Sequence, residues 1–126
     1  MTRTKRFPDA TLAEISASKI LGVRAGSQPH RFIGIWVVVV EKRVFVRSWS
    51  IKARSWYRTF LEEPEGALTI NGREYAVRAV LTRSERLKAA VDKAYLQKYS
   101  TPASHKYARD LGKKRPRDTT TELVPL

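Results

Sequence analysis

The sequence predicts an α+β fold that is mainly β: a small antiparallel barrel with helices at its flanks. Three observations support this class: two predicted hairpins, a short helical segment between them, and a long helix followed by a terminal strand. At 126 residues the chain suits one domain with a substantial core. We expect residues 1–8 to form a basic arm and residues 9–126 to form a single domain.

The first element expected after the arm is a short helix. Thr11 and Glu14 have the spacing of a capping box, and Gly22 would end the helix. Apolar residues form a stripe along it: Leu12, Ile15, Ile20 and Leu21. Residues 23–31 contain glycine and proline and are expected to form a loop.

The next segment has the composition of a β-hairpin. Residues 32–40 are rich in β-branched and aromatic side chains without alternation, which is typical of a strand buried on both faces. Residues 41–43 would form the turn, and residues 44–49 would return as the second strand. Alternation places Val44, Val46 and Ser48 on one face and Phe45, Arg47 and Trp49 on the other.

The second half combines a secure hairpin with a long helix. Ser55 can cap a short helix that Pro64 ends, and residues 67–70 and 73–81 are strands joined by Asn71-Gly72, a dipeptide that accepts the positive φ angles of a tight turn. Ser84 begins the longest helix, which should cover the open face of the sheet. Residues 101–118 are polar and basic, without a predicted element, and residues 119–124 form a closing strand.

The charge distribution indicates an anionic partner. Lys and Arg number 25 against 12 Asp and Glu, which gives a net charge of +13. Eight of these cations lie between residues 24 and 58, interleaved with aromatic residues: Arg24, Arg31, Lys42, Arg43, Arg47, Lys52, Arg54 and Arg58, with Trp36, Trp49, Trp56 and Tyr57. Either a phosphorylated aromatic cofactor or a nucleic acid strand meets both demands, because phosphates bind cations and rings stack on indoles.

Several functional classes are excluded or disfavoured. The chain has no cysteine, so thiolate metal sites and cysteine nucleophiles are absent. His30 and His105 have no acidic residue beside them in the sequence, and no metal-ligand cluster or nucleophile motif is present. The N-terminus does not resemble a secretory signal and no apolar run could span a bilayer, so we expect a cytoplasmic protein without a membrane partner.

The candidate site is a phosphate and ring site near the end of the first hairpin. Arg47 and Ser48 end a strand, and cations and a helix start follow within one loop, a combination suited to a phosphate. The predicted cofactor-binding residues are Arg24, Arg47, Ser48, Trp49, Lys52, Arg54, Ser55, Trp56, Tyr57 and Arg58. Trp36, Trp56 and Tyr57 also suit the core of a small barrel. No catalytic residue is predicted, so any chemistry would come from the cofactor.

Six segments carry a resemblance to known proteins: residues 35–40, 44–48, 56–58, 71–78, 94–99 and 121–125. Together they resemble an uncharacterised bacterial family, domain-of-unknown-function family 2255. More distantly, residues 22–80 are similar to the deazaflavin-dependent nitroreductases among the FMN-binding split β-barrels. Residues 22–26 match the glycine-and-arginine loop of that group in part, and Trp56-Tyr57 with Glu63-Pro64 match another of its motifs.

The distant resemblance implies a split barrel of the flavin-binding type that binds FMN or a deazaflavin and acts as an oxidoreductase on a small molecule. It also implies a homodimer, in which Arg24 or Arg31 of one chain would meet Arg47 of the other. Two alternatives stay open at this point. The chain could be a non-enzymatic basic barrel that binds nucleic acid through phosphate contacts, or a cofactor-free barrel that serves protein contacts.

Overall fold

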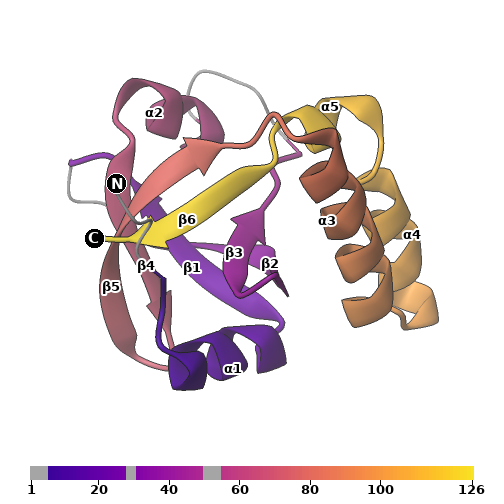
Figure 1. Cartoon of the computed structure of the whole chain (residues 1–126), viewed down its shortest axis with the longest axis horizontal. Coiled ribbons are helices and arrows are strands. Elements are labelled where there is room, and N and C mark those ends of the chain that lie inside the picture. The colour runs from indigo at the N-terminus through magenta and orange to yellow at the C-terminus, as the bar shows by residue number, and fades with distance from the viewer. Residues whose placement is uncertain (1–5, 28–30, 50–54) are drawn as a thin grey trace.

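A computed structural model of the chain describes residues 6–27, 31–49 and 55–126. Within these residues the elements are α1 (Asp9–Ala17), β1 (Ile20–Ala25), β2 (Ile33–Val40), β3 (Arg43–Val46), α2 (Trp56–Glu62), β4 (Glu65–Ile70), β5 (Arg73–Leu81), α3 (Glu85–Lys98), α4 (Pro102–Asp110), α5 (Lys114–Asp118) and β6 (Thr121–Pro125). The strands close into an antiparallel barrel in the order β1-β2-β3-β6-β5-β4 (Figure 1). The predicted α+β barrel is therefore confirmed.

Two tight turns define the hairpins of this barrel. Glu41 and Lys42 have φ angles of 53° and 61°, and Asn71 and Gly72 have φ angles of 49° and 78°. Positive φ at both central residues is the signature of the turn whose twist matches that of the paired strands. The predicted Asn71-Gly72 turn is confirmed, and the first hairpin turns on two residues because Arg43 already belongs to β3.

A short helix is present as predicted, but the prediction was wrong about its cap, its end and the loop at residues 23–31. Helix α1 ends at Ala17, and its N-cap position is Pro8, which makes no side-chain hydrogen bond, so no capping box forms at Thr11. The segment Ile20–Ala25 is instead strand β1, which closes the barrel by pairing with β2 and β4. Its alternating burial, with Leu21, Val23 and Ala25 inside, is the period of a strand. The residues likened to a glycine-and-arginine loop thus lie mostly in a strand.

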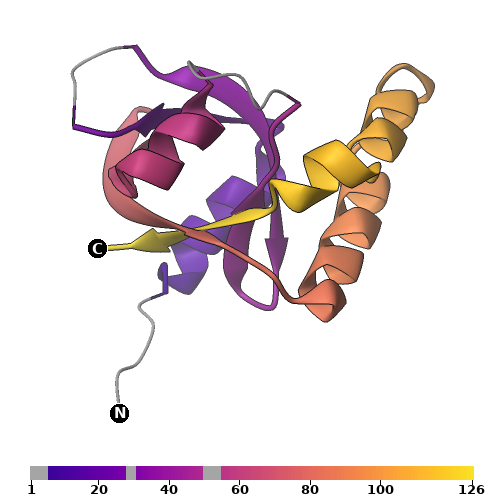
Figure 2. The same ribbon diagram turned by 90° about the horizontal axis from the view of Figure 1, so that it is seen from above.

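Two hydrophobic cores lie on opposite faces of β2 and β3. The barrel interior holds Val37, Val44 and Val46, while Val38 and Phe45 face outward against the helices. The expectation of a strand buried on both faces is therefore confirmed at Val37 and Val38, whereas Ile33 and Gly34 are exposed. Figures 1 and 2 show α3 and α4 packed side by side against that outer face, with α1 and α2 at the two ends of the barrel.

The polar segment 101–118 contains two helices that were not predicted. Thr101 caps α4, and Pro102 occupies its first turn, a favourable position for proline. Helix α5 covers much of the basic run 113–117, with Pro116 within its first three residues. At the other end of the chain, Phe7 is buried in the barrel core, so the predicted arm 1–8 includes a core residue.

No helix in the described residues is long and apolar enough to cross a membrane. Likewise, residues 6–27, 31–49 and 55–126 contain no cluster of three or more His, Cys, Asp or Glu that could hold a metal ion.

Candidate functional site

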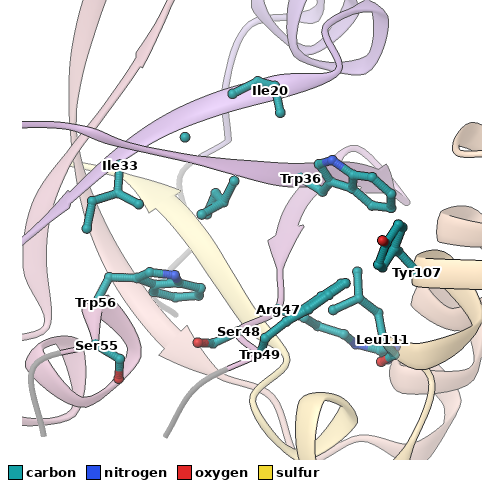
Figure 3. A pocket seen from close by; sticks show the side chains of 12 residues that line it. Ile20, Ile33, Trp36, Arg47, Ser48, Trp49, Ser55, Trp56, Tyr107 and Leu111 are labelled. Carbon is teal, nitrogen blue, oxygen red and sulfur yellow. The ribbon is translucent and has the colours of Figure 1, made fainter. Parts of the chain in front are cut away.

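A pocket occupies the place where β2 and β3 separate. The two strands pair from Val37–Val46 to Val40–Arg43, whereas residues 33–36 of β2 pair with β1 alone. The pocket has a volume of about 710 Å³. It is lined by Ile20, Ile33, Gly34, Ile35, Trp36, Arg47, Ser48, Trp49, Ser55, Trp56, Tyr107 and Leu111 (Figure 3). The barrel is closed, but β2 and β3 diverge at this end, and the pocket fills the gap between them, called the split below.

Aromatic rings form opposite walls of the pocket. Figure 3 shows Trp56 on one side, and Trp36 with Tyr107 on the other. Trp36 stacks on Tyr99 with ring centroids 3.9 Å apart and an interplanar angle of 1°, and the edge-on partner of Trp36 is Trp49. Trp49 and Tyr107 are 42% and 47% exposed, so both can change contacts when a ligand enters. All three tryptophans of the chain line this pocket.

Trp36 is held in place by Tyr95 of α3 and by Tyr99, the residue that follows this helix. The Tyr99 hydroxyl accepts from the Val37 amide at 3.1 Å and donates to the Lys19 carbonyl at 2.6 Å. The Tyr95 hydroxyl donates to the Trp36 carbonyl at 3.1 Å. Burial raises the pKa of Tyr95 and raises the pKa of Tyr99 to about 12, so both hydroxyls stay protonated at neutral pH.

Lys98 completes this support beneath the pocket wall. Its amine donates to the Val37 carbonyl at 2.7 Å and to the Ile15 carbonyl at 3.3 Å, which links α3 to β2 and α1. Burial lowers the pKa of Lys98 to about 8, because desolvation disfavours the charged amine.

Arg47 is the polar centre between the barrel and the helices. Its side chain is 0% exposed, and its guanidinium donates to Asp92 Oδ1 at 2.6 Å. It also donates to the Thr120 hydroxyl and to two backbone carbonyls, those of Leu111 and Lys88, at 2.8–3.0 Å. Four of its five N–H groups therefore have partners inside the chain.

Asp92 extends this contact into an ionic network. Its second carboxylate oxygen accepts from Arg117 Nε at 3.1 Å, and Arg117 donates to Glu85 at 2.6 Å. The Arg117 guanidinium holds the pKa of the Glu85 carboxyl below its usual value. The network ties α3 to α5 and to the segment that carries Leu111, and so positions one wall of the pocket.

Five of the ten predicted cofactor-binding residues line the pocket: Arg47, Ser48, Trp49, Ser55 and Trp56. Tyr57 packs against the barrel core, and Arg58 is exposed on α2; neither lines the pocket. The Ser55 hydroxyl accepts from the Arg58 amide and so caps α2, as predicted. Lys52 and Arg54 lie outside the described residues.

Arg24 lies in a different place from the other predicted residues. It donates to Glu74 at 2.6 Å, and its guanidinium lies over the Phe32 ring at 4.6 Å. Together with Glu74 it lines a second pocket of about 600 Å³ on β1, β4 and β5. Within one chain, Arg24 and Arg47 therefore do not contribute to the same pocket.

Seven of the twelve pocket residues are not among the predicted cofactor-binding residues: Ile20, Ile33, Gly34, Ile35, Trp36, Tyr107 and Leu111. The pattern Leu21, Val23, Ala25 could have identified β1 and placed Ile20 on its outer face. Thr101-Pro102 could have identified the start of α4. Neither signal reveals that Tyr107 packs 6.2 Å from Trp49, because that contact depends on how α4 docks.

Comparisons with known proteins bear on the family and the fold. The family model described as "Uncharacterized protein conserved in bacteria (DUF2255)" matches residues 10–123. A search of curated proteins gives no match. Among solved structures, the chain is similar to the conserved hypothetical protein Rv2991 from Mycobacterium tuberculosis, with a TM-score of 0.62 and 12% identity over 100% of this chain and 84% of that one. This likeness supports the fold alone.

Proposed function

The chain belongs to the bacterial DUF2255 family, and we propose that it binds a flavin-like cofactor, FMN or a deazaflavin, in the aromatic pocket of the split barrel. We propose further that it acts as an oxidoreductase on a small molecule. The observation that carries the proposal is the pocket between β2 and β3, whose lining includes three tryptophans and Tyr107.

The shape and chemistry of the pocket suit a flat ring system. Its volume of about 710 Å³ lies within the range of roughly 300–1,000 Å³ typical of small-molecule sites. The lining is mostly aliphatic and aromatic, and the indoles offer flat faces on which a conjugated ring can stack. Beside these, the lining has few polar side chains, namely Arg47, Ser48 and Ser55, and such a composition is usual for a cofactor site.

The described residues offer aromatic faces that suit a ring but do not assemble a phosphate site. Arg47 directs its guanidinium to acceptors within the chain, and Arg24 pairs with Glu74 in the second pocket. The proposal therefore rests on the ring. A ligand with the ring and no phosphate should retain much of the affinity.

The chain contributes position and exclusion of water to any reaction at this site. Trp36 and Trp56 enclose the ring from opposite walls, and apolar residues such as Leu111 keep water away from it. A flavin or deazaflavin supplies hydride transfer when bound, a reaction for which no acid–base pair is needed in principle.

Tryptophan fluorescence provides a direct test of binding. Because every tryptophan of the chain lines the pocket, a ring that enters it should quench most of the intrinsic emission. We expect titration with FMN and with a deazaflavin to saturate near one ligand per chain. Absence of saturation with either ligand would contradict the proposal.

A matched pair of variants locates the ligand. Trp49→Ala removes an exposed ring and should weaken binding on the order of tenfold, since stacking contributes about 1–3 kcal/mol. Leu61→Ala removes a side chain that is 49% exposed on α2 and does not line the pocket. Ligand absorbance, which does not depend on the number of tryptophans, reports both affinities. Equal affinities in the two variants would place the ligand elsewhere.

Nucleic acid binding without catalysis is the second candidate, and the net charge of +13 favours it. Several cations of the basic run are engaged in ion pairs, Lys113 with Asp110, Lys114 with Asp118 and Arg117 with Glu85. This reading predicts binding to single-stranded DNA that falls steeply with salt and does not depend on base sequence. Fluorescence anisotropy of a labelled oligonucleotide at 50 and 200 mM salt would measure it.

A further inference from the structure

The backbone groups of β2 can be assigned to its two edges. The Val37 amide donates to the Tyr99 hydroxyl, which in turn donates to the Lys19 carbonyl, so the groups of Val37 face the β1 side. Val40 and Arg43 close a two-residue turn, which directs the groups of Val40 toward β3. Both observations indicate that odd-numbered residues of β2 direct their backbone groups toward β1 and even-numbered residues toward β3. Since successive residues of a strand direct their groups to opposite edges, Trp36 and Gly34 face the β3 side.

Among the described residues, that edge is open at Gly34. The pairing of β3 with β2 ends at Val37–Val46, and the Trp36 carbonyl is occupied by the Tyr95 hydroxyl. Gly34 has no strand partner on this edge among the described residues, and it is both exposed and part of the pocket lining. Its N–H and C=O therefore form an adjacent donor and acceptor pair that faces the split.

We propose that the open edge of β2 at Gly34 binds the cyclic amide or imide edge of a flat heteroaromatic ligand. The Gly34 N–H donates to a ring carbonyl, and the Gly34 C=O accepts from the neighbouring ring N–H, as a strand residue does with its partner in a ladder. This inference rests on the proposed function and narrows it to rings that carry a C=O beside an N–H.

Gly34 has no side chain that could cover its backbone groups. A Cβ at this position would meet Ile20 Cγ2 at 2.9 Å, so the outer face of β2 has little room beside the backbone. The isoalloxazine of FMN and the ring of a deazaflavin both carry an imide edge. The site would accept either, and it would reject a flat tricycle that lacks this edge, since the Gly34 groups would lose water without gaining a partner.

A pair of ligands tests the inference without any mutation. Lumiflavin has the imide N–H and no phosphate, and 3-methyllumiflavin replaces that N–H with N–CH₃. We expect the full chain to bind lumiflavin at least tenfold more tightly, measured by tryptophan quenching. Equal affinities would overturn the inference and leave the proposed function standing. If neither ring binds, the proposed function is overturned and the inference with it.

Two variants of Gly34 test the role of its backbone N–H as a hydrogen-bond donor. Gly34→Ala and Gly34→Pro both add a Cβ, but only proline removes the N–H, and an open strand edge is where a strand tolerates proline. Lumiflavin affinity should be at least fivefold lower in Gly34→Pro than in Gly34→Ala. Equal affinities in two variants with wild-type circular dichroism would overturn the contact. If Gly34→Pro does not fold, the comparison of lumiflavin with 3-methyllumiflavin alone decides whether the inference holds.

Discussion

Replacing Arg47 by methionine separates a structural role from a ligand-binding role. The sequence predicts Arg47 as a cofactor-binding cation, whereas in the structure its guanidinium is buried and donates to four acceptors. We expect Arg47→Met to destabilise the fold strongly. Binding of a ring without phosphate should change little in the molecules that remain folded.

The magnitude follows from what the substitution leaves behind. Breaking a buried ion pair costs about 3–5 kcal/mol, mainly because the partner charge stays buried without a counter-charge. Asp92 is 30% exposed and keeps Arg117 at 3.1 Å, so its carboxylate is not isolated. The Leu111 carbonyl loses the guanidinium donor, at about 1–3 kcal/mol for an unsatisfied buried group. Together these considerations give a loss of about 3 kcal/mol.

Urea unfolding measures this loss. With a slope of about 1.5 kcal/mol per molar urea, the midpoint should fall by about 2 M. Arg83→Met is the control, since Arg83 is exposed on a loop, and it should change stability by less than about 0.5 kcal/mol. A loss below about 1 kcal/mol for Arg47→Met, together with tenfold weaker FMN binding, would refute the structural role and support the cation site.

Three further predictions concern the supports and the mouth of the pocket. The pKa of Lys98 falls from 10.5 to about 8 on folding, so between these pH values the unfolded chain binds more protons and stability rises with pH. Because the amine is only half-buried, we expect the free energy of unfolding in urea to rise by about 1 kcal/mol from pH 7.5 to 9.5. This gain should be absent in Lys98→Met, and equal gains in the wild type and the variant would contradict the prediction. Tyr99→Phe keeps the stacked ring but loses the hydroxyl that connects the Val37 amide to the Lys19 carbonyl. It should lower the free energy of unfolding by about 1–3 kcal/mol. An unchanged midpoint of urea unfolding would show that these two hydrogen bonds do not contribute to stability. We propose that the homodimer implied by the family resemblance buries Ile20, which is 53% exposed in the single chain. Ile20→Glu should then convert a dimer to a monomer in a sedimentation measurement. A wild-type protein that stays monomeric at high concentration would contradict the dimer.

The sequence predicted the elements whose signals are local. Asn71-Gly72 requires positive φ wherever it occurs in a hairpin, and Ser55 and Ser84 each cap a helix with their own hydroxyl. The polar segment 101–118 also carries a local helix start that our prediction did not use. Strand β1 was missed because glycine and helix-compatible residues masked its alternation.

The sequence by itself determined the α+β barrel class, the family resemblance, the positive charge and the aromatic content of the candidate site. Only the tertiary structure decided which of those residues share a pocket. Arg47 and Arg24 look alike in sequence, yet one is buried between the barrel and three distant segments, 41 to 73 residues away, and the other lies in a separate pocket. Side-chain burial and the open edge at Gly34 depend on where β3 leaves β2 and where α3 and α4 dock, and these are properties of long-range packing that no local pattern records.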